Sequence, residues 1–293
     1  MLKVANISMR YHRAEKSVFS DVSFELNSSE IMPLIGGNGS GKTTLLRILA
    51  GIIRPEKGSA CINGVDILSR TIEAQRSIGI SLYPERSFYY RLTGRQNIEY
   101  FASLKGIFGK EAKREANRVL SELGLEDKAD SMFMRMSLGQ RRRLGVSRAI
   151  LGSPSLLLLD EPTSNLDASG TFLVQDVISR HASAGGSVII STHHQQDLRL
   201  STKAVLALKN GRCELLLSNK SILSRKIEFS FESKNSSAIH KLSEKYPITL
   251  SSDGALVDVP VEISLAQIVE EISGLGICIS SVKDTMWFPE RNS

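Results

Sequence analysis

Apolar residues in the first three quarters of the chain follow two alternating patterns. Some runs are short and almost continuously apolar, which is typical of strands covered on both faces. These runs are residues 31–35, 155–159, 187–191 and 203–208. Residues 2–9 and 22–26 also have strand patterns, and residues 42–50 have helical spacing. Because strands alternate with helices, we predict an α/β domain over residues 1–217.

The pattern becomes helical between about residues 92 and 152, where charged faces such as KEAKREANR predict a helical subdomain. A polar stretch, SNKSILSRK, follows residue 217 and is interpreted as a linker. After it, six segments alternate as β-α-β-β-α-β. We therefore predict a second, small α+β domain of ferredoxin-like type over residues 218–293.

Charge is unevenly distributed along the chain. The first 220 residues contain 30 Lys and Arg against 21 Asp and Glu, whereas the remainder is net acidic. A basic first domain suits a polyanionic ligand, such as a triphosphate, a nucleic acid or an acidic lipid surface. No signal peptide is recognisable, and no apolar run approaches the length needed to cross a bilayer. The three cysteines lack metal-site or disulfide spacing, which indicates a reducing compartment.

The segment GGNGSGKT, Gly36 to Thr43, fits the pattern GxxxxGK[ST] between a predicted strand and a predicted helix. Glycines allow the backbone to approach phosphates closely, and the helix N-terminus favours negative charge. Lys42 would reach the β- and γ-phosphates, and the Thr43 hydroxyl would ligate Mg²⁺. The alternative is an ordinary glycine-rich turn. The motif and its context favour a nucleotide-binding loop.

The segment SLLLLDE ends a predicted buried strand with two carboxylates, Asp160 and Glu161. Open α/β sheets bind ligands at the C-terminal ends of their strands. Asp160 is therefore predicted to face the Mg²⁺ ion, and Glu161 to orient or deprotonate the attacking water. Many core strands end in an acidic residue, so the functional interpretation depends on the nearby phosphate loop.

Three segments of the chain have a characteristic order and spacing: GGNGSGKT, then MSLGQRRRLGVSRAILGSPSLLLLDEPTSNLD, then VIISTHH. In this order and spacing the chain resembles the ATP-binding cassette (ABC) ATPases over residues 1–217. Within the family it is most similar to ATPase subunits of bacterial ABC-2-type exporters, because RLTGRQNIEYFASLKG resembles their corresponding segment. The resemblance implies a P-loop NTPase fold of ABC type, with a mixed sheet core, an antiparallel β subdomain and a helical subdomain. It also implies ATP and Mg²⁺ as ligands.

Further site residues follow from the resemblance by position. Tyr11 corresponds to the aromatic residue that stacks on adenine, although a core aromatic is the alternative. Ser137 to Gln140 corresponds to the signature that contacts ATP held by an opposite subunit. Asp167 corresponds to the D-loop and His193 to the switch histidine of the H-loop. The predicted nucleotide-binding residues are Tyr11, Gly36, Gly37, Asn38, Gly39, Ser40, Gly41, Lys42, Thr43, Thr44, Ser137, Gly139, Gln140 and Asp167, and the predicted catalytic residues are Glu161 and His193.

Two positions depart from the family pattern. Leu138 replaces the first glycine of the signature, which leaves the Ser137 hydroxyl and the Gly139 amide available. Pro84 stands where the family has a glutamine that ligates Mg²⁺ and contacts the membrane partner. Glu85 is next to it and is assigned as a third metal ligand beside Thr43 and Asp160.

The resemblance implies an ATP hydrolase that drives transport, with export favoured over import. Its expected partners are a polytopic membrane subunit on a separate chain and a second ATPase subunit, identical or related. The chain is then expected in the cytoplasm, peripheral on the inner face of the cell membrane, without nucleic acid. Two alternatives stay open: a soluble ABC-type ATPase acting on nucleic acid or ribosomes, and a nucleotide sensor with low turnover.

Overall fold

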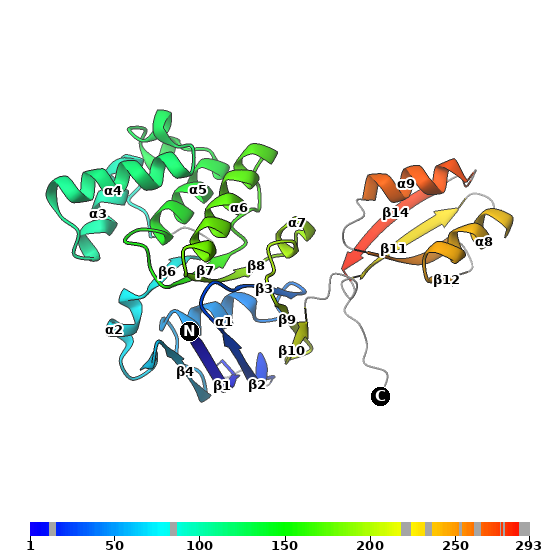
Figure 1. Cartoon of the computed structure of the whole chain (residues 1–293), viewed down its shortest axis with the longest axis horizontal. Coiled ribbons are helices and arrows are strands. Elements are labelled where there is room, and N and C mark those ends of the chain that lie inside the picture. The colour runs from blue at the N-terminus through cyan, green and yellow to red at the C-terminus, as the bar shows by residue number, and fades with distance from the viewer. Residues whose placement is uncertain are drawn as a thin grey trace. The chain divides into compact units, whose positions relative to one another are not determined.

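The protein is described from a computed structural model, which covers residues 1–11, 16–82, 87–217, 224–231, 236–251, 254–260, 265–275, 277 and 279–286. The chain divides into two compact units, Met1–Leu216 and Leu217–Ser293. Each unit is described by itself (Figure 1). No helix within the described residues is long and apolar enough to span a bilayer.

A six-stranded sheet forms the centre of the first unit. Its strands lie in the order β10-β9-β3-β8-β7-β6, and the pairs β9/β3, β3/β8, β8/β7 and β7/β6 are parallel. The strands are β3 (Ile31–Gly36), β6 (Ile78–Ser81), β7 (Leu156–Asp160), β8 (Ser187–Ser191), β9 (Ala204–Lys209) and β10 (Arg212–Leu217). In the β7/β8 register Asp160 lies opposite Ser191, so the C-terminal ends of these two strands meet at one edge.

Both faces of this sheet are covered. In β7, Leu157 and Leu159 pack into a core shared with the helices α3 to α6, whereas Leu156 and Leu158 pack into a core shared with the antiparallel strands. Figure 1 shows α3, α4 and α5 on one side of the sheet and β1, β2 and β4 on the other. All five residues of β7 are buried, which explains why its sequence is a continuous apolar run rather than an alternating one.

A second, four-stranded sheet has the order β2-β1-β4-β5, and its paired strands are antiparallel. Its strands are β1 (Leu2–Met9), β2 (Phe19–Leu26), β4 (Lys57–Ile62) and β5 (Val65–Asp66). In β2, buried and exposed residues alternate along most of the strand, as expected when one face packs on the core and the other meets water. The helices α1 (Lys42–Leu49) and α2 (Thr71–Arg76) complete this half of the unit.

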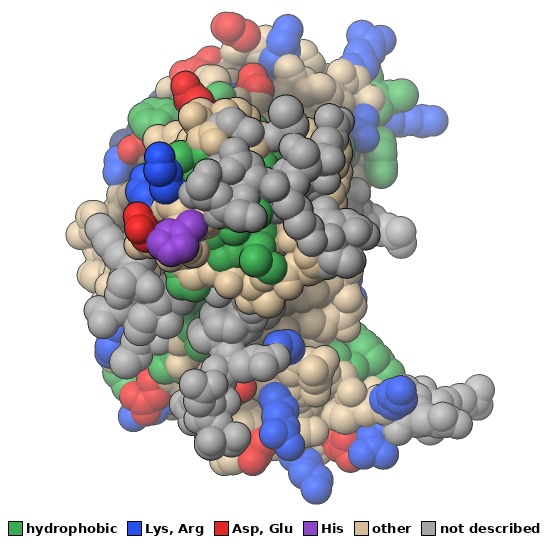
Figure 2. Space-filling model, turned by 90° about the vertical axis from the view of Figure 1, so that its right-hand side faces the viewer, with side chains coloured by type: hydrophobic (Ala, Val, Ile, Leu, Met, Phe, Trp, Pro, Cys, Tyr) green, Lys and Arg blue, Asp and Glu red, His purple; other side chains and the backbone are tan. Residues whose placement is uncertain are grey.

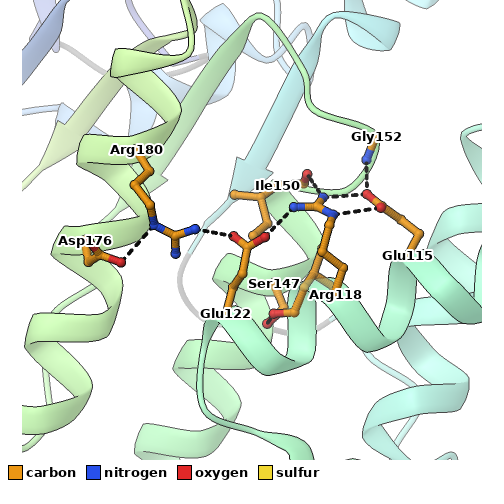
Figure 3. Close-up of polar contacts among 9 residues, drawn as sticks. Glu115, Arg118, Glu122, Ser147, Ile150, Gly152, Asp176 and Arg180 are labelled. Carbon is orange, nitrogen blue, oxygen red and sulfur yellow. Dashed lines mark hydrogen bonds and ion pairs between the residues drawn. The ribbon is translucent and has the colours of Figure 1, made fainter.

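The helical part of the first unit contains α3 (Gly94–Leu104), α4 (Gly109–Glu122) and α5 (Leu138–Ala149), with short 3-10 turns at Glu126–Lys128 and Phe133–Arg135. Ion pairs tie α4 to α6 (Ala168–Ser183), as Figure 3 shows. Arg118 contacts Glu115 and Glu122 at 2.6 Å each, and Glu122 also lies 3.6 Å from Arg180 of α6. The network connects the helical part to the helix that follows β7.

The second unit is built from β11 (Ser224–Phe231), α8 (Ser236–Lys245), β12 (Ile248–Leu250), β13 (Gly254–Pro260), α9 (Leu265–Gly274) and β14 (Ile279–Met286). Its sheet has the order β12-β13-β11-β14, and all neighbouring strands are antiparallel. Phe229, Val257 and Ile268 are among the fully buried residues of its separate apolar core. It is a small α+β domain.

Candidate active site

The loop between β3 and α1 has a backbone that favours glycine at two positions. Gly39 has φ of 77° and Gly41 has φ of 104°, both in the left-handed region. A Cβ on Gly41 would lie 2.7 Å from Val18 Cγ1 and 2.9 Å from Phe19 Cδ1. The loop therefore needs glycine at position 41 for its conformation and for its packing against β2.

We expect Gly41→Ala to weaken ATP binding by about tenfold, because a strained left-handed alanine and its contact with Phe19 would displace the start of α1. Isothermal titration with Mg-ATP measures this. Gly274→Ala is the matched control, because an added Cβ there meets no atom within 4 Å and the residue lies in the second unit. An unchanged affinity for Gly41→Ala would contradict the assignment of the loop as the phosphate-binding element.

Lys42, the first residue of α1, turns its side chain back over the loop. Its Nζ donates hydrogen bonds to the carbonyl oxygens of Gly36 at 2.7 Å and Gly37 at 3.2 Å. Burial lowers the pKa of Lys42, and the negative charges of Glu161 and Asp160 offset this only in part. The ammonium group is thus held inside the loop, where an anionic ligand would restore favourable surroundings for its charge.

Two other loop side chains are placed for a ligand. The Ser40 Oγ is buried and has no hydrogen-bond partner within the described part of the chain. An unsatisfied buried hydroxyl of this kind calls for a partner, and a phosphate oxygen is one that it could bind. The Thr44 Oγ1 forms a 2.9 Å hydrogen bond with the Tyr11 hydroxyl. Tyr11 is 43% exposed, so it lies beside the loop and is not a core aromatic.

Thr43 connects the loop to the end of β7. Its Oγ1 donates to Asp160 Oδ2 at 2.8 Å, and the Ser191 hydroxyl donates to Asp160 Oδ1 at 2.5 Å. Asp160 is buried, and its two oxygens are therefore fixed by a hydroxyl from the start of α1 and a hydroxyl from the end of β8. Mg²⁺ prefers one or two carboxylates together with substrate phosphates, so a buried carboxylate beside a hydroxyl and a phosphate loop fits that ion.

Glu161 follows β7 in an unusual backbone conformation with φ of 48°. Its amide N–H donates to the carbonyl and hydroxyl oxygens of Ser191 at 3.0 and 3.1 Å. A non-glycine residue in the left-handed region is uncommon and persists only where surrounding contacts hold it. The conformation turns the side chain out of the strand direction and away from the apolar core.

The Glu161 carboxylate is held at both oxygens. His193 Nδ1 lies 3.2 Å from Oε1, and the Ser164 hydroxyl donates to Oε2 at 3.0 Å. Ser164 Oγ also lies 3.4 Å from His194 Nε2. Burial by itself raises the pKa of Glu161, but His193, the Ser164 hydrogen bond and Lys42 together lower it below the ordinary carboxyl value. Glu161 is therefore ionised at neutral pH and can accept a proton.

The signature residues form the start of α5. Ser137 caps the helix by accepting from Gln140 N at 3.2 Å, and the Gln140 side chain accepts from Ser137 N at 2.9 Å. Asp167 caps α6 in the same way, accepting from Gly170 N at 2.8 Å. A Cβ on Gly139 would lie 3.4 Å from the Asn165 carbonyl oxygen, so the starts of the two helices are close together.

The structure does not bring every predicted residue to one place. Within the described residues, no hydrogen bond or ion pair joins Ser137, Gly139 or Gln140 to the phosphate loop. Gly37, Asn38 and Gly39 lie in the loop itself. Pro84 and Glu85 lie outside the described residues, so the third predicted metal ligand has no structural description.

Arg141 and Arg143, which follow the signature in α5, contact groups of their own domain. Arg141 donates to the Met134 carbonyl oxygen at 2.8 Å and lies over the Phe133 ring. Arg143 donates to the carbonyl oxygens of Leu123 and Gly124 at 2.6 and 2.9 Å. Arg142 is buried. Arg141 and Arg143 thus hold α5 to the preceding turns and do not form a free basic patch.

The sequence interpretation missed the hydroxyls that position the carboxylates. Ser191 ends β8, directly opposite Asp160 in the parallel register, and Ser164 follows Glu161 by three residues. One signal was available for Ser191, because polar residues at the ends of adjacent parallel strands meet at the same edge. Ser164 had no comparable signal, since its contact depends on the turn after Glu161.

A glycine-rich loop between β3 and α1, a lysine folded over it and two carboxylates at the end of β7 define a P-loop nucleotide-binding site in a parallel sheet. A family model described as ABC transporter matches residues 19–164. The ABC transporter ATP-binding protein NatA of Bacillus subtilis is 27% identical over 213 residues, which cover 72% of this chain and 87% of NatA.

The phosphonates import ATP-binding protein PhnC 2 of a Synechococcus species is 33% identical over 224 residues, which cover 72% of this chain and 82% of that protein. A solved dimer of an ATP-binding cassette in a post-hydrolysis state with ADP and Pi matches with a TM-score of 0.67 at 25% identity. This match covers 74% of this chain and 99% of the solved chain.

The chain belongs to the ATP-binding proteins of ABC transporters. ATP hydrolysis is the activity of this family, so the chain is an ATP hydrolase. The predicted fold class, a P-loop NTPase of ABC type, is confirmed by the solved cassettes that it resembles. Cassettes of this family form dimers and work with membrane subunits.

Proposed function

We propose that this chain binds Mg-ATP in a head-to-tail dimer and hydrolyses it to drive transport, in the export direction, through a membrane subunit on a separate chain. The observation that carries the proposal is the carboxylate arrangement at the end of β7. Asp160 contacts Thr43 of the phosphate loop, and the next residue, Glu161, contacts His193. The proposed metal ligand, Asp160, and the proposed base, Glu161, thus lie next to each other, beside the phosphate loop.

Each side chain then has a defined task. Lys42 and the loop amides of residues 36–43 bind the phosphates, and Thr44 lies where a further hydroxyl can reach them. Tyr11 offers an exposed ring on which adenine can stack. Thr43 and Asp160 would hold Mg²⁺, with Glu85 as a third candidate ligand. When bound, the ion neutralises charge on the β- and γ-phosphates.

Glu161 acts as the general base towards the attacking water. Its carboxylate is ionised, and His193 and Ser164 hold its two oxygens, so the base is oriented before ATP arrives. His193 is half-exposed, which leaves its second ring nitrogen accessible to a phosphate oxygen or water. A base held in this way loses little conformational freedom in the transition state.

The exposed starts of α5 and α6 support a dimeric site. Ser137 is exposed and Gly139 is half-buried at the N-terminal end of a twelve-residue helix, an end that favours anions. Because these residues make no described contact with their own phosphate loop, we assign Ser137, Gly139 and Gln140, with Asp167 nearby, to ATP held by a second subunit. That subunit is a second copy or a related cassette.

Nucleic acid is not the proposed partner. Arg141 and Arg143, after the signature, bind carbonyl oxygens and an aromatic ring of their own domain. On the face shown in Figure 2, basic side chains stand singly or in small groups with acidic ones among them, and this face has no continuous basic surface in its described part. A membrane subunit would place the chain on the inner face of the cell membrane.

Export through a partner is tested with the tagged chain isolated from detergent-solubilised membranes of its host. We expect a polytopic membrane protein to co-purify and to raise ATP turnover severalfold, because the partner stabilises the closed dimer. Inside-out vesicles carrying the complex should accumulate its substrate only with ATP. Capture of ribosomal proteins alone, or stimulation by DNA instead, would contradict the proposal. Uptake by right-side-out vesicles would reverse the assigned direction.

A further inference from the structure

A fully buried carboxylate lies behind the catalytic side chains. Asp197, in the short helix α7 (Gln195–Leu198), is 0% exposed. Its Oδ2 accepts hydrogen bonds from Thr163 Oγ1 and Thr192 Oγ1, both at 2.6 Å, and its Oδ1 accepts from Gln175 Nε2 at 2.9 Å. Three segments far apart in the sequence therefore meet at one side chain.

The two threonines lie next to the proposed catalytic residues in the chain. Thr163 follows Glu161 by two residues, and Thr192 directly precedes His193. Both threonines are buried, so their hydroxyls are shielded from water. Because both bond the same oxygen of Asp197, the turn after β7 and the turn after β8 are joined to each other immediately behind the contact between Glu161 and His193.

Thr192 has a second contact that fixes the backbone around His193. Its Oγ1 accepts from His194 N at 2.9 Å while it donates to Asp197, and its own amide N–H donates to the Leu34 carbonyl oxygen at 3.1 Å. The residues on both sides of His193 are thus held, although the His193 ring itself is half-exposed. The His193 imidazole, whose ring centroid lies 4.1 Å from that of His194, is therefore positioned through this backbone.

Glu161 needs similar support, because its φ of 48° is in a sparsely populated region. Such conformations persist only where surrounding contacts hold them. The bonds from the Glu161 amide to Ser191 hold the turn from one end, and the Thr163–Asp197 bond holds it two residues later. A buried carboxylate that accepts three hydrogen bonds is a rigid anchor, since loosening it would expose unsatisfied polar groups.

We infer that Asp197 is a positioning residue for ATP hydrolysis, which holds Thr163 and Thr192 together so that His193 stays in contact with Glu161. The inference rests on the proposed function, because it assigns Asp197 to the same hydrolytic site. Asp197 acts through the two threonines and touches neither ATP nor the attacking water.

The threonines allow a test that keeps the carboxylate in place. Removing Asp197 itself would leave two buried hydroxyls without an acceptor and could unfold the domain. Thr192→Val keeps the shape and removes only the hydroxyl, whereas Thr192→Ser keeps the hydroxyl. We expect Thr192→Val to lower kcat about tenfold with KM for ATP within about twofold, and Thr192→Ser to restore most of the rate. The pair Thr163→Val and Thr163→Ser should behave alike.

A double-mutant cycle with His193→Ala separates positioning from general damage. If Thr192 acts through His193, Thr192→Val should lower single-turnover hydrolysis in the wild-type protein but hardly change it in the His193→Ala protein. Equal losses in both backgrounds would overturn the inference, as would a wild-type rate for Thr192→Val.

The same measurements distinguish failure of the inference from failure of the proposed function. A His193→Ala protein with wild-type turnover would overturn the assignment of His193, and the inference with it. A slow His193→Ala protein together with a fully active Thr192→Val protein would overturn only the role of Asp197. Thermal unfolding of each valine and serine variant shows that compared proteins are equally folded.

Discussion

Glu161→Gln abolishes steady-state ATP hydrolysis, with an expected loss in kcat of about 100-fold or more, while ATP binding is retained. Glutamine has nearly the same shape as glutamate and can still accept the Ser164 hydrogen bond, but it cannot take a proton from water. Phosphate release under saturating ATP measures turnover, and titration with a fluorescent ATP analogue measures binding.

Glu126→Gln is the matched control for this change. Glu126 also accepts a serine hydroxyl, from Ser121 at 2.5 Å, and that bond lowers its pKa, but the residue lies on the helical part away from the phosphate loop. Its replacement should leave turnover unchanged. Hydrolysis by Glu161→Gln at the wild-type rate would remove the base assignment, whereas loss of both binding and turnover would indicate a structural role.

The central sheet shows what an apolar pattern predicts well. The run at residues 155–159 became β7, which is Leu156–Asp160, because a strand buried on both faces needs apolar side chains at every position. β1 and β8 have the predicted bounds, Leu2–Met9 and Ser187–Ser191. β2 begins at Phe19, three residues earlier than predicted, because the polar Ser20 and Asp21 belong to a strand with one solvent face.

Other elements had no clear pattern in the sequence. The strands β5 and β6 and the helix α2 are short, and β4 begins with three exposed residues, so neither strand nor helix periodicity is sustained. In such segments pairing with distant strands decides the structure. Lys57–Ile62, for example, forms a strand because it pairs with β1.

At the site, some residues were predictable from a sequence motif, whereas others are brought together only by the fold. Lys42, Thr43 and Asp160 were expected to be close, and the contact of Thr43 with Asp160 at 2.8 Å agrees with that expectation. The hydrogen bonds to Asp197 were not predictable, because their donors, Thr163, Gln175 and Thr192, precede Asp197 in the sequence by 5 to 34 residues and lie in different parts of the fold. No sequence motif identifies side-chain hydroxyls and amides of this kind, because their hydrogen-bond partners depend on tertiary packing.

Lys42→Met weakens ATP binding strongly without unfolding the protein. The ammonium group bonds only carbonyl oxygens of its own loop in the described structure, and burial lowers its pKa, so its charge does not stabilise the free protein. Phosphates would pair with that charge directly. Loss of such bonds amounts to about 3 kcal/mol, which corresponds to an affinity decrease of about 100-fold. Isothermal titration with Mg-ATP measures it.

A second lysine with a lowered pKa, Lys105, provides the control for Lys42→Met. Burial also lowers the pKa of Lys105, whose Nζ donates to the Leu151 carbonyl oxygen at 2.9 Å, but this residue lies at the end of α3, outside the phosphate loop. Lys105→Met should bind ATP as the wild-type protein does. Thermal unfolding shows whether both variants are folded. If a folded Lys42→Met protein bound ATP with wild-type affinity, Lys42 would not contribute to phosphate binding. Equal losses in both variants would point to a general effect of removing a lysine charge.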